Sequence, residues 1–195
     1  MFTAWLRKIS RWLVEPFAAL LARLGLTPNA LTIIGCLLNI GVAVIIAQGH
    51  LLWGGVALAA ASGFDALDGT LARQLGRSTK FGAFLDSVLD RVSESAVLLG
   101  LAYYYMGRGG TTEEFLAFVA IVGSLLVSYT RARAEGLQID CKGGILTRVE
   151  RCLLLIAALI LNLTTPALWI LAGGTTFTTI QRIWHVRRAL ADAAL

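Results

Sequence analysis

The sequence predicts an all-α integral membrane protein in which six transmembrane helices follow an N-terminal interfacial amphipathic helix. Its residues are 57% hydrophobic and only 15% charged, with a mean hydropathy of +0.74, whereas a soluble domain carries about 25% charged residues. It also contains six apolar segments long enough to cross a bilayer at about 20 residues per span. We expect one domain over residues 1–195, with an interfacial region at 1–27 and a six-span bundle at 28–188.

The N-terminal segment has the pattern of a helix lying in the membrane interface. Apolar residues recur at helical spacing on one face, and basic residues occupy the rest of the surface. The apolar residues are Phe2, Trp5, Leu6, Ile9, Trp12 and Leu13, and the basic residues are Arg7, Lys8 and Arg11. Thr27-Pro28-Asn29 then predicts a turn leading into the first span.

The charge of the connections predicts the orientation of the bundle. We expect spans over residues 29–48, 51–73, 81–106, 114–134, 145–163 and 166–187. Basic residues gather on one side of these spans, namely Arg73, Arg77, Lys80, Arg131, Arg133, Lys142, Arg148, Arg151, Arg182, Arg187 and Arg188. The connections on the other side hold only Arg108. By the positive-inside rule, both termini and the basic connections face the cytoplasm, and the protein lies among the lipids of the cytoplasmic membrane.

Four carboxylates interrupt the second and third spans. Asp65, Asp68, Asp86 and Asp90 would together cost on the order of 10 kcal/mol if they stayed ionised in the bilayer without partners. At helical spacing, the first two share one helix face and the last two share a face of the next helix. Carboxylates bind Mg²⁺ or Mn²⁺, and such ions neutralise phosphate oxygens during displacement reactions. The pattern therefore predicts a metal-dependent enzyme that acts on phosphates.

Two other interpretations account for these carboxylates less well. Acidic pairs at helical spacing usually mark a solvated helix face, but these pairs lie in apolar spans that converge. A divalent-cation transporter would also use carboxylates within the membrane, but it does not explain Gly69, Gly82 and Arg73, which suit a bulky phosphate ligand. A transporter would also be expected to show broken helices or repeated halves.

The spacing of these residues resembles the signature of the CDP-alcohol phosphatidyltransferase family. The matched positions extend over 26 residues and are Asp65, Asp68, Gly69, Ala72, Arg73, Gly82, Asp86 and Asp90. The six-span plan with an interfacial helix is also similar to that family. The resemblance implies transfer of a phosphatidyl group from a CDP-linked lipid to an alcohol, with release of CMP. It also implies a homodimer, and no nucleic-acid partner is expected.

The resemblance further implies roles for individual residues. Two divalent metal ions, Mg²⁺ or Mn²⁺, would be bound by Asp65, Asp68, Asp86 and Asp90. Asp90 would also act as the general base on the acceptor hydroxyl. The CDP-lipid would contact Pro28, Asn29, Ala30, Leu31, Gly69, Ala72, Arg73, Thr79 and Gly82.

A second stretch indicates which alcohol accepts the lipid. Residues 128–137 and 143–151 are similar to the acceptor segments of phosphatidylinositol-phosphate synthases and their archaeal ether-lipid relatives. That likeness implies inositol phosphate as acceptor, with its phosphate bound by Ser128, Arg131, Arg133, Arg151 and Arg182. Several guanidinium groups suit a phosphorylated acceptor, although the positive-inside rule also accounts for basic residues at span ends. Glycerol 3-phosphate is the alternative acceptor, because it would use a similar basic pocket. Arg91 and Glu94, three residues apart, are expected to pair within the bundle.

Overall fold

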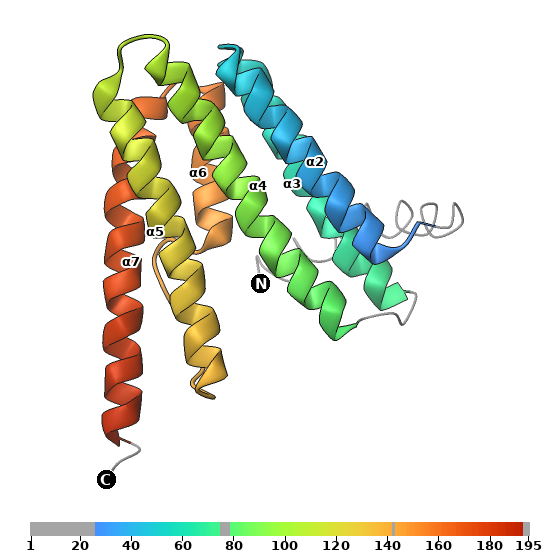
Figure 1. The fold of residues 1–195 in the computed structure, drawn as a ribbon, viewed down its shortest axis with the longest axis vertical. Coiled ribbons are helices and arrows are strands. Elements are labelled where there is room, and N and C mark those ends of the chain that lie inside the picture. Colours follow the sequence, from blue (N-terminus) through green and yellow to red (C-terminus); the bar gives the residue numbers. More distant parts are fainter. Residues whose placement is uncertain (1–25, 75–78, 142, 193–195) are drawn as a thin grey trace, which may run out of the picture.

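The computed structural model of the chain is helical throughout its described part (Figure 1). That part comprises residues 26–74, 79–141 and 143–192, and it excludes the side chains of residues 65–74. The predicted interfacial helix within residues 1–25 therefore lies outside the described residues. The helices are α2 (Pro28–Ala47), α3 (Leu51–Gln74), α4 (Lys80–Met106), α5 (Thr111–Gly136), α6 (Arg148–Ile160) and α7 (Thr164–Asp192).

Each predicted span contains one of these helices, but α6 is shorter than the span predicted over residues 145–163. It has 13 residues, which at 1.5 Å per residue is about 20 Å and less than the roughly 30 Å hydrocarbon core. Figure 1 shows that α6 is shorter than α5 and α7. The chain before α6 is instead a loop that folds back into the bundle, where Cys141 and Leu146 are buried.

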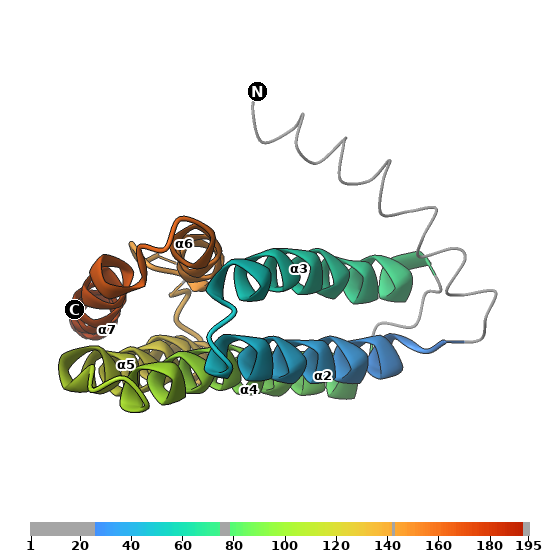
Figure 2. The same cartoon turned by 90° about the horizontal axis from the view of Figure 1, so that it is seen from above.

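The helices pack as a closed ring in the order α2, α4, α5, α7, α6 and α3. Backbone contacts join α2 to α3 and α4, α4 to α5, α5 to α7, and α6 to both α3 and α7. Seen from above, α3 and α6 lie in one layer over α2, α4 and α5 (Figure 2). The helices α4 and α6 are therefore not neighbours in the ring but face each other across it.

The two ends of the ring differ in character. The apolar core surrounds Leu98, Leu101, Leu168 and Leu171, near the α4–α5 and α6–α7 turns. The starts of α2, α4 and α6 and the ends of α3, α5 and α7 lie toward the opposite end (Figure 1). The predicted site residues all belong to this second end.

The exterior of the ring is apolar, whereas several interior side chains are polar. Leu37, Val122 and Leu153 are 61%, 56% and 61% exposed, while Arg151 and Thr175 are 1% and 0% exposed. This reversal of the soluble pattern is expected when lipid is the solvent, because polar groups must find partners inside the protein. The chain is therefore a membrane protein.

Two described helices, α2 and α5, are long and apolar enough to span a membrane, and residues Leu51–Phe64 of α3 form a shorter apolar stretch. The other long helices are more polar. Helix α4 carries Asp86, Asp90, Arg91 and Glu94, and α7 contains six threonines. Hydropathy along the described helices thus identifies fewer spans than the sequence segmentation predicted.

Close packing of α2 on α4 depends on Gly100. A Cβ at this position would overlap the backbone of Ala43 on α2, which cannot move aside cheaply. Gly41 is a matched contrast within α2, because a Cβ there would meet nothing within 4 Å.

We therefore expect Gly100→Ala to lower the free energy of unfolding by about 1–3 kcal/mol, because overpacking forces the backbones apart. Gly41→Ala should leave stability unchanged or raise it slightly, because alanine favours the helix more than glycine. Thermal denaturation of the purified protein in detergent measures both. Equal stability of the two variants would show that α2 and α4 are not in close contact.

Candidate active site

The starts of α2 and α4 lie side by side at the polar end of the ring. Thr27 caps α2 by accepting the Ala30 N–H at 3.2 Å, and Thr79 caps α4 by accepting the Gly82 N–H at 2.9 Å. A Cβ at Gly82 would lie 3.1 Å from Asn29 Oδ1. Helix N-termini present unpaired N–H groups and the positive end of the helix dipole, so this pair of helix starts favours an anion.

The structure thus brings together Asn29, Thr79 and Gly82 from two separate parts of the chain. All three are among the residues predicted to contact the CDP-lipid. Of the others, Pro28 occupies the first turn of α2, where it preorganises the helix. Leu31 is 1% exposed and packs in the interior, and the predicted contacts of Pro28, Ala30 and Leu31 with the CDP-lipid stay predictions.

The end of α3 carries the first half of the signature. Its backbone is helical through Gln74 and approaches the starts of α2 and α4 (Figure 1). The side chains there lie outside the described part, so the metal and CDP roles of this group stay predictions. The group comprises Asp65, Asp68, Gly69, Ala72 and Arg73.

The second half of the signature lies on α4, where Asp86 and Asp90 are one turn apart and partly buried. They supply two of the four predicted metal ligands. Among the described residues there is no group of three or more His, Cys, Asp or Glu side chains that could hold a metal ion. The predicted set is complete only with the two aspartates of α3.

Asp90 faces two arginines. Its Oδ1 atom lies 2.7 Å from Nη2 of Arg148, and its Oδ2 atom lies 3.7 Å from Nη1 of Arg91. The side chain of Asp90 is 13% exposed and that of Arg148 is 43% exposed. The first of these contacts joins the last carboxylate of the signature to the first turn of α6.

A second ion pair crosses the ring one turn further along α4. Arg151 holds Glu94 in a two-pronged contact, with Nε to Oε1 at 2.5 Å and Nη2 to Oε2 at 2.7 Å. The expected pairing of Glu94 with Arg91 is therefore wrong. Arg91 instead donates to the Ser87 carbonyl at 2.5 Å, because a side chain from across the ring reaches Glu94 with better geometry.

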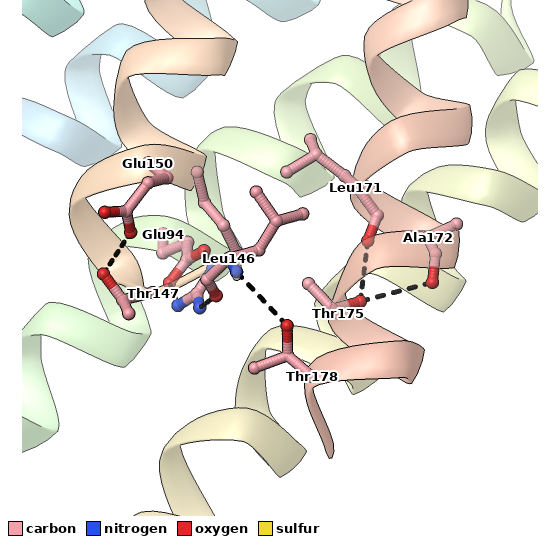
Figure 3. A network of polar contacts seen from close by, with 9 residues as sticks. Glu94, Leu146, Thr147, Glu150, Leu171, Ala172, Thr175 and Thr178 are labelled. Carbon is pink, nitrogen blue, oxygen red and sulfur yellow. Dashed lines mark hydrogen bonds and ion pairs between the residues drawn. The ribbon is translucent and has the colours of Figure 1, made fainter. Parts of the chain in front are cut away.

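The loop before α6 is fastened on both sides. Arg151 Nη1 donates to the Leu146 carbonyl at 2.9 Å, and the Leu146 N–H donates to Thr178 Oγ1 of α7 at 3.2 Å (Figure 3). Arg182 Nε donates to the Gly143 carbonyl at 3.0 Å. Gly144 has φ +149°, and a Cβ there would lie 2.7 Å from Thr178 Cγ2. These contacts hold the loop between α6 and α7.

The predicted acceptor residues separate into buried and exposed members. Arg182 is buried, with Nη1 donating to the Val127 carbonyl of α5, and Ser128 follows directly in the chain. Arg131 is exposed and pairs with Glu135 at 2.8 Å, and Arg133 is also exposed. The structure thus joins Arg182 to the α5 segment that carries Ser128, and it places Arg151 on Glu94.

Sequence reasoning missed Glu94 as a partner of α6 and did not include Arg148 among the site residues. The available signal was the four-residue step from Asp90 to Glu94, matched by the three-residue step from Arg148 to Arg151. Sequence reasoning also missed Asn39, a buried polar residue of α2 that donates to the Gly35 carbonyl at 2.9 Å. Asn39, Asp90, Glu94 and Arg148 line a cavity of about 30 Å³.

Comparison with protein families identifies what the chain resembles. The model of the family described as CDP-alcohol phosphatidyltransferase matches residues 25–181. A phosphatidylinositol phosphate synthase of Corynebacterium glutamicum is 36% identical over 91% of this chain and 85% of its own length. An archaetidylinositol phosphate synthase of Pyrococcus horikoshii is 36% identical over 91% of this chain and 92% of its own.

Solved structures agree with the sequence relatives. Phosphatidylinositol phosphate synthase of Mycobacterium tuberculosis with CDP-DAG bound superposes with a TM-score of 0.85 at 30% identity, covering 89% of this chain and 92% of that one. The same synthase in complex with manganese and citrate gives a TM-score of 0.83 at 30% identity, covering 89% and 88%.

The difference in burial between the two cross-ring pairs predicts different consequences of losing each arginine. Arg151→Ala should lower the free energy of unfolding by about 3–5 kcal/mol, because it leaves the Glu94 charge buried without a partner. Arg148→Ala should cost no more than about 1 kcal/mol, because its guanidinium is already accessible to water. Thermal or denaturant unfolding in detergent measures both variants. Similar losses for the two would contradict the assigned burial.

Proposed function

Because this chain belongs to the CDP-alcohol phosphatidyltransferase family, we propose that it transfers a phosphatidyl group from a CDP-linked diradylglycerol to the hydroxyl of inositol 1-phosphate and releases CMP. The synthases similar to it along nearly their whole length support this choice of acceptor. Within the chain, one observation carries the proposal. Asp90 of the signature lies 2.7 Å from Arg148, which belongs to the segment 143–151 that resembles an acceptor segment.

The donor occupies the side of the site formed by the starts of α2 and α4 and the end of α3. The paired helix starts at Asn29 and Gly82 favour the diphosphate of a CDP-linked lipid. Gly69, Ala72 and Arg73 belong to the end of α3 that approaches them. The lack of a large side chain at Gly82 leaves the backbone of α4 open to a bulky ligand.

The donor set suits divalent metal ions. Carboxylate oxygens are hard ligands of the kind that Mg²⁺ and Mn²⁺ take, and two of the four predicted ligands lie one turn apart on α4. We propose that Asp65, Asp68, Asp86 and Asp90 hold two such ions. When bound, they supply neutralising charge to the phosphate oxygens of the donor.

Asp90 is the proposed general base. Its carboxylate accepts the proton of the acceptor hydroxyl, and the acceptor oxygen then forms a bond to the lipid-side β-phosphorus. The bond between that phosphorus and the oxygen bridging to the α-phosphate breaks, and CMP leaves with the electron pair. Because a carboxylate beside cations is a weak base, positioning contributes more to this step than basicity does.

The acceptor phosphate is bound by the arginine side of the site. We propose Ser128, Arg131, Arg133, Arg151 and Arg182 for this role and add Arg148. Arg151 already uses three of its five N–H groups on Glu94 and Leu146, whereas Arg148 is 43% exposed and lies beside the proposed base. Glycerol 3-phosphate would present the same phosphate to these residues and is the second candidate acceptor.

We also propose that the chain crosses the membrane six times, with α6 and the loop before it together making the fifth crossing, and with both termini and the site on the cytoplasmic side. Among the described residues, Arg108 is the only Lys or Arg near the turns at the end opposite the site. The positive-inside rule then favours a cytoplasmic site end. The family resemblance further supports a homodimer.

In the presence of Mg²⁺, the purified protein should release CMP from CDP-diacylglycerol when inositol 1-phosphate is the acceptor. It should release little CMP when free inositol or serine is offered instead. The reason is that the arginine side of the site requires an anionic phosphate on the acceptor. Turnover restricted to glycerol 3-phosphate would reverse the choice of acceptor.

Excess EDTA should abolish CMP release, and added Mg²⁺ or Mn²⁺ should restore it.

Asp90→Asn should lower kcat by about 10²–10⁴-fold, because general-base catalysis contributes rate factors of that size. Asp192→Asn is the matched control, because this exposed residue lies in the last turn of α7, outside the site. Manganese content of each protein, measured by metal analysis, separates loss of the base from loss of metal. Near-full turnover of Asp90→Asn with metal bound would remove Asp90 from the base role.

A further inference from the structure

Glu94 lies one helical turn beyond Asp90 on α4, so the two carboxylates share a helix face. Opposite them, the first turn of α6 presents Arg148 and Arg151, which are three residues apart. Arg148 meets Asp90 at 2.7 Å, and Arg151 meets Glu94 at 2.5 and 2.7 Å. These contacts join two helices that face each other across the ring, so the side chains bridge the interior of the bundle.

The two ion pairs differ in how accessible their arginines are to a ligand. Arg148 is 43% exposed and lies 2.7 Å from Oδ1 of Asp90, so a ligand that enters from solvent can reach its guanidinium. Arg151 is 1% exposed and holds both oxygens of Glu94. A buried guanidinium with this geometry is fixed in place, because no water can replace the carboxylate.

Because Arg151 is fixed, it also fixes the loop before α6, which lies on the acceptor side of the site. Its Nη1 atom donates to the Leu146 carbonyl, and the Leu146 N–H donates to Thr178 of α7 (Figure 3). Thr147 follows Leu146 and is the N-cap of α6, and Arg148 is the first residue of that helix. The direction in which Arg148 leaves the backbone therefore depends on the contact between Arg151 and Glu94.

We propose that Glu94 is a positioning residue for the acceptor phosphate. It touches neither substrate in this role, and it acts through Arg151 to hold the loop and the first turn of α6 in register with Asp90. The proposal rests on the proposed function, in that the ligand is a phosphorylated alcohol, but it does not depend on which phosphorylated alcohol is used.

Steady-state kinetics of CMP release with CDP-diacylglycerol and inositol 1-phosphate test this role. Glu94→Gln keeps the shape of the side chain and removes its charge, so the acceptor KM should rise about ten- to hundredfold, as expected when binding groups are misplaced by about 1 Å. The KM for CDP-diacylglycerol should not change. Glu94→Asp keeps the charge on a shorter stem and should give an intermediate acceptor KM. Glu114→Gln, in the first turn of α5 away from the site, is the matched control and should behave as wild type.

A second comparison separates positioning from a general loss of structure. If Glu94 acts through Arg151, then Glu94→Gln should add no further rise in acceptor KM to an Arg151→Gln variant. Independent, multiplicative effects would overturn the proposal. So would equal rises in both KM values, or an unchanged acceptor KM in both Glu94 variants.

The wild-type reaction separates this proposal from the proposed function. If wild type turns over glycerol 3-phosphate in place of inositol 1-phosphate, the same variants are measured with glycerol 3-phosphate, and the same split between the two KM values is expected. Absence of CMP release with every acceptor would contradict the proposed function itself.

Discussion

The ion pair between Glu94 of α4 and Arg151 of α6 bridges the interior of the helical ring. Both charges are largely removed from water, and each is tolerated there because the other neutralises it in a two-pronged contact. The same arginine fastens the loop before α6 through the Leu146 carbonyl. The ring can therefore carry a short helix opposite α4 and still present the first turn of that helix to Asp90.

This arrangement follows from lipid being the solvent. The outer faces of the helices gain nothing from polar groups, so polar side chains collect inside, where each can find a partner. At one end of the ring these groups are sparse and leucines fill the core. At the other end, helix starts, carboxylates and guanidinium groups converge. The proposed reaction uses this contrast, because the starts of α2 and α4 suit the donor diphosphate and the first turn of α6 suits the acceptor phosphate.

Much of the fold could be predicted from periodicity and charge. All six apolar segments contain helices, and the helix start at Thr27-Pro28-Asn29 and the family of the chain were both correctly predicted. The length of α6 was not correctly predicted. Hydropathy assigns residues 145–147 to the apolar span, although they form a loop that Arg151 and Thr178 hold by hydrogen bonds. The predicted pairing of Glu94 with Arg91 was also wrong, because spacing along one helix cannot reveal a residue that comes from a helix across the ring. The metal roles of Asp65, Asp68, Asp86 and Asp90 stay predictions.

By itself, the sequence determined the helical class, the reaction family and the carboxylates of the signature, because these depend on local spacing and on residue chemistry. Only the tertiary structure decided which charges meet. It placed Asn29 beside Gly82, and it showed that Arg148 forms an ion pair with Asp90 and Arg151 with Glu94. Such pairings depend on which helices face each other across the ring, and that in turn depends on close packing at glycines such as Gly100 and on a loop held from two sides.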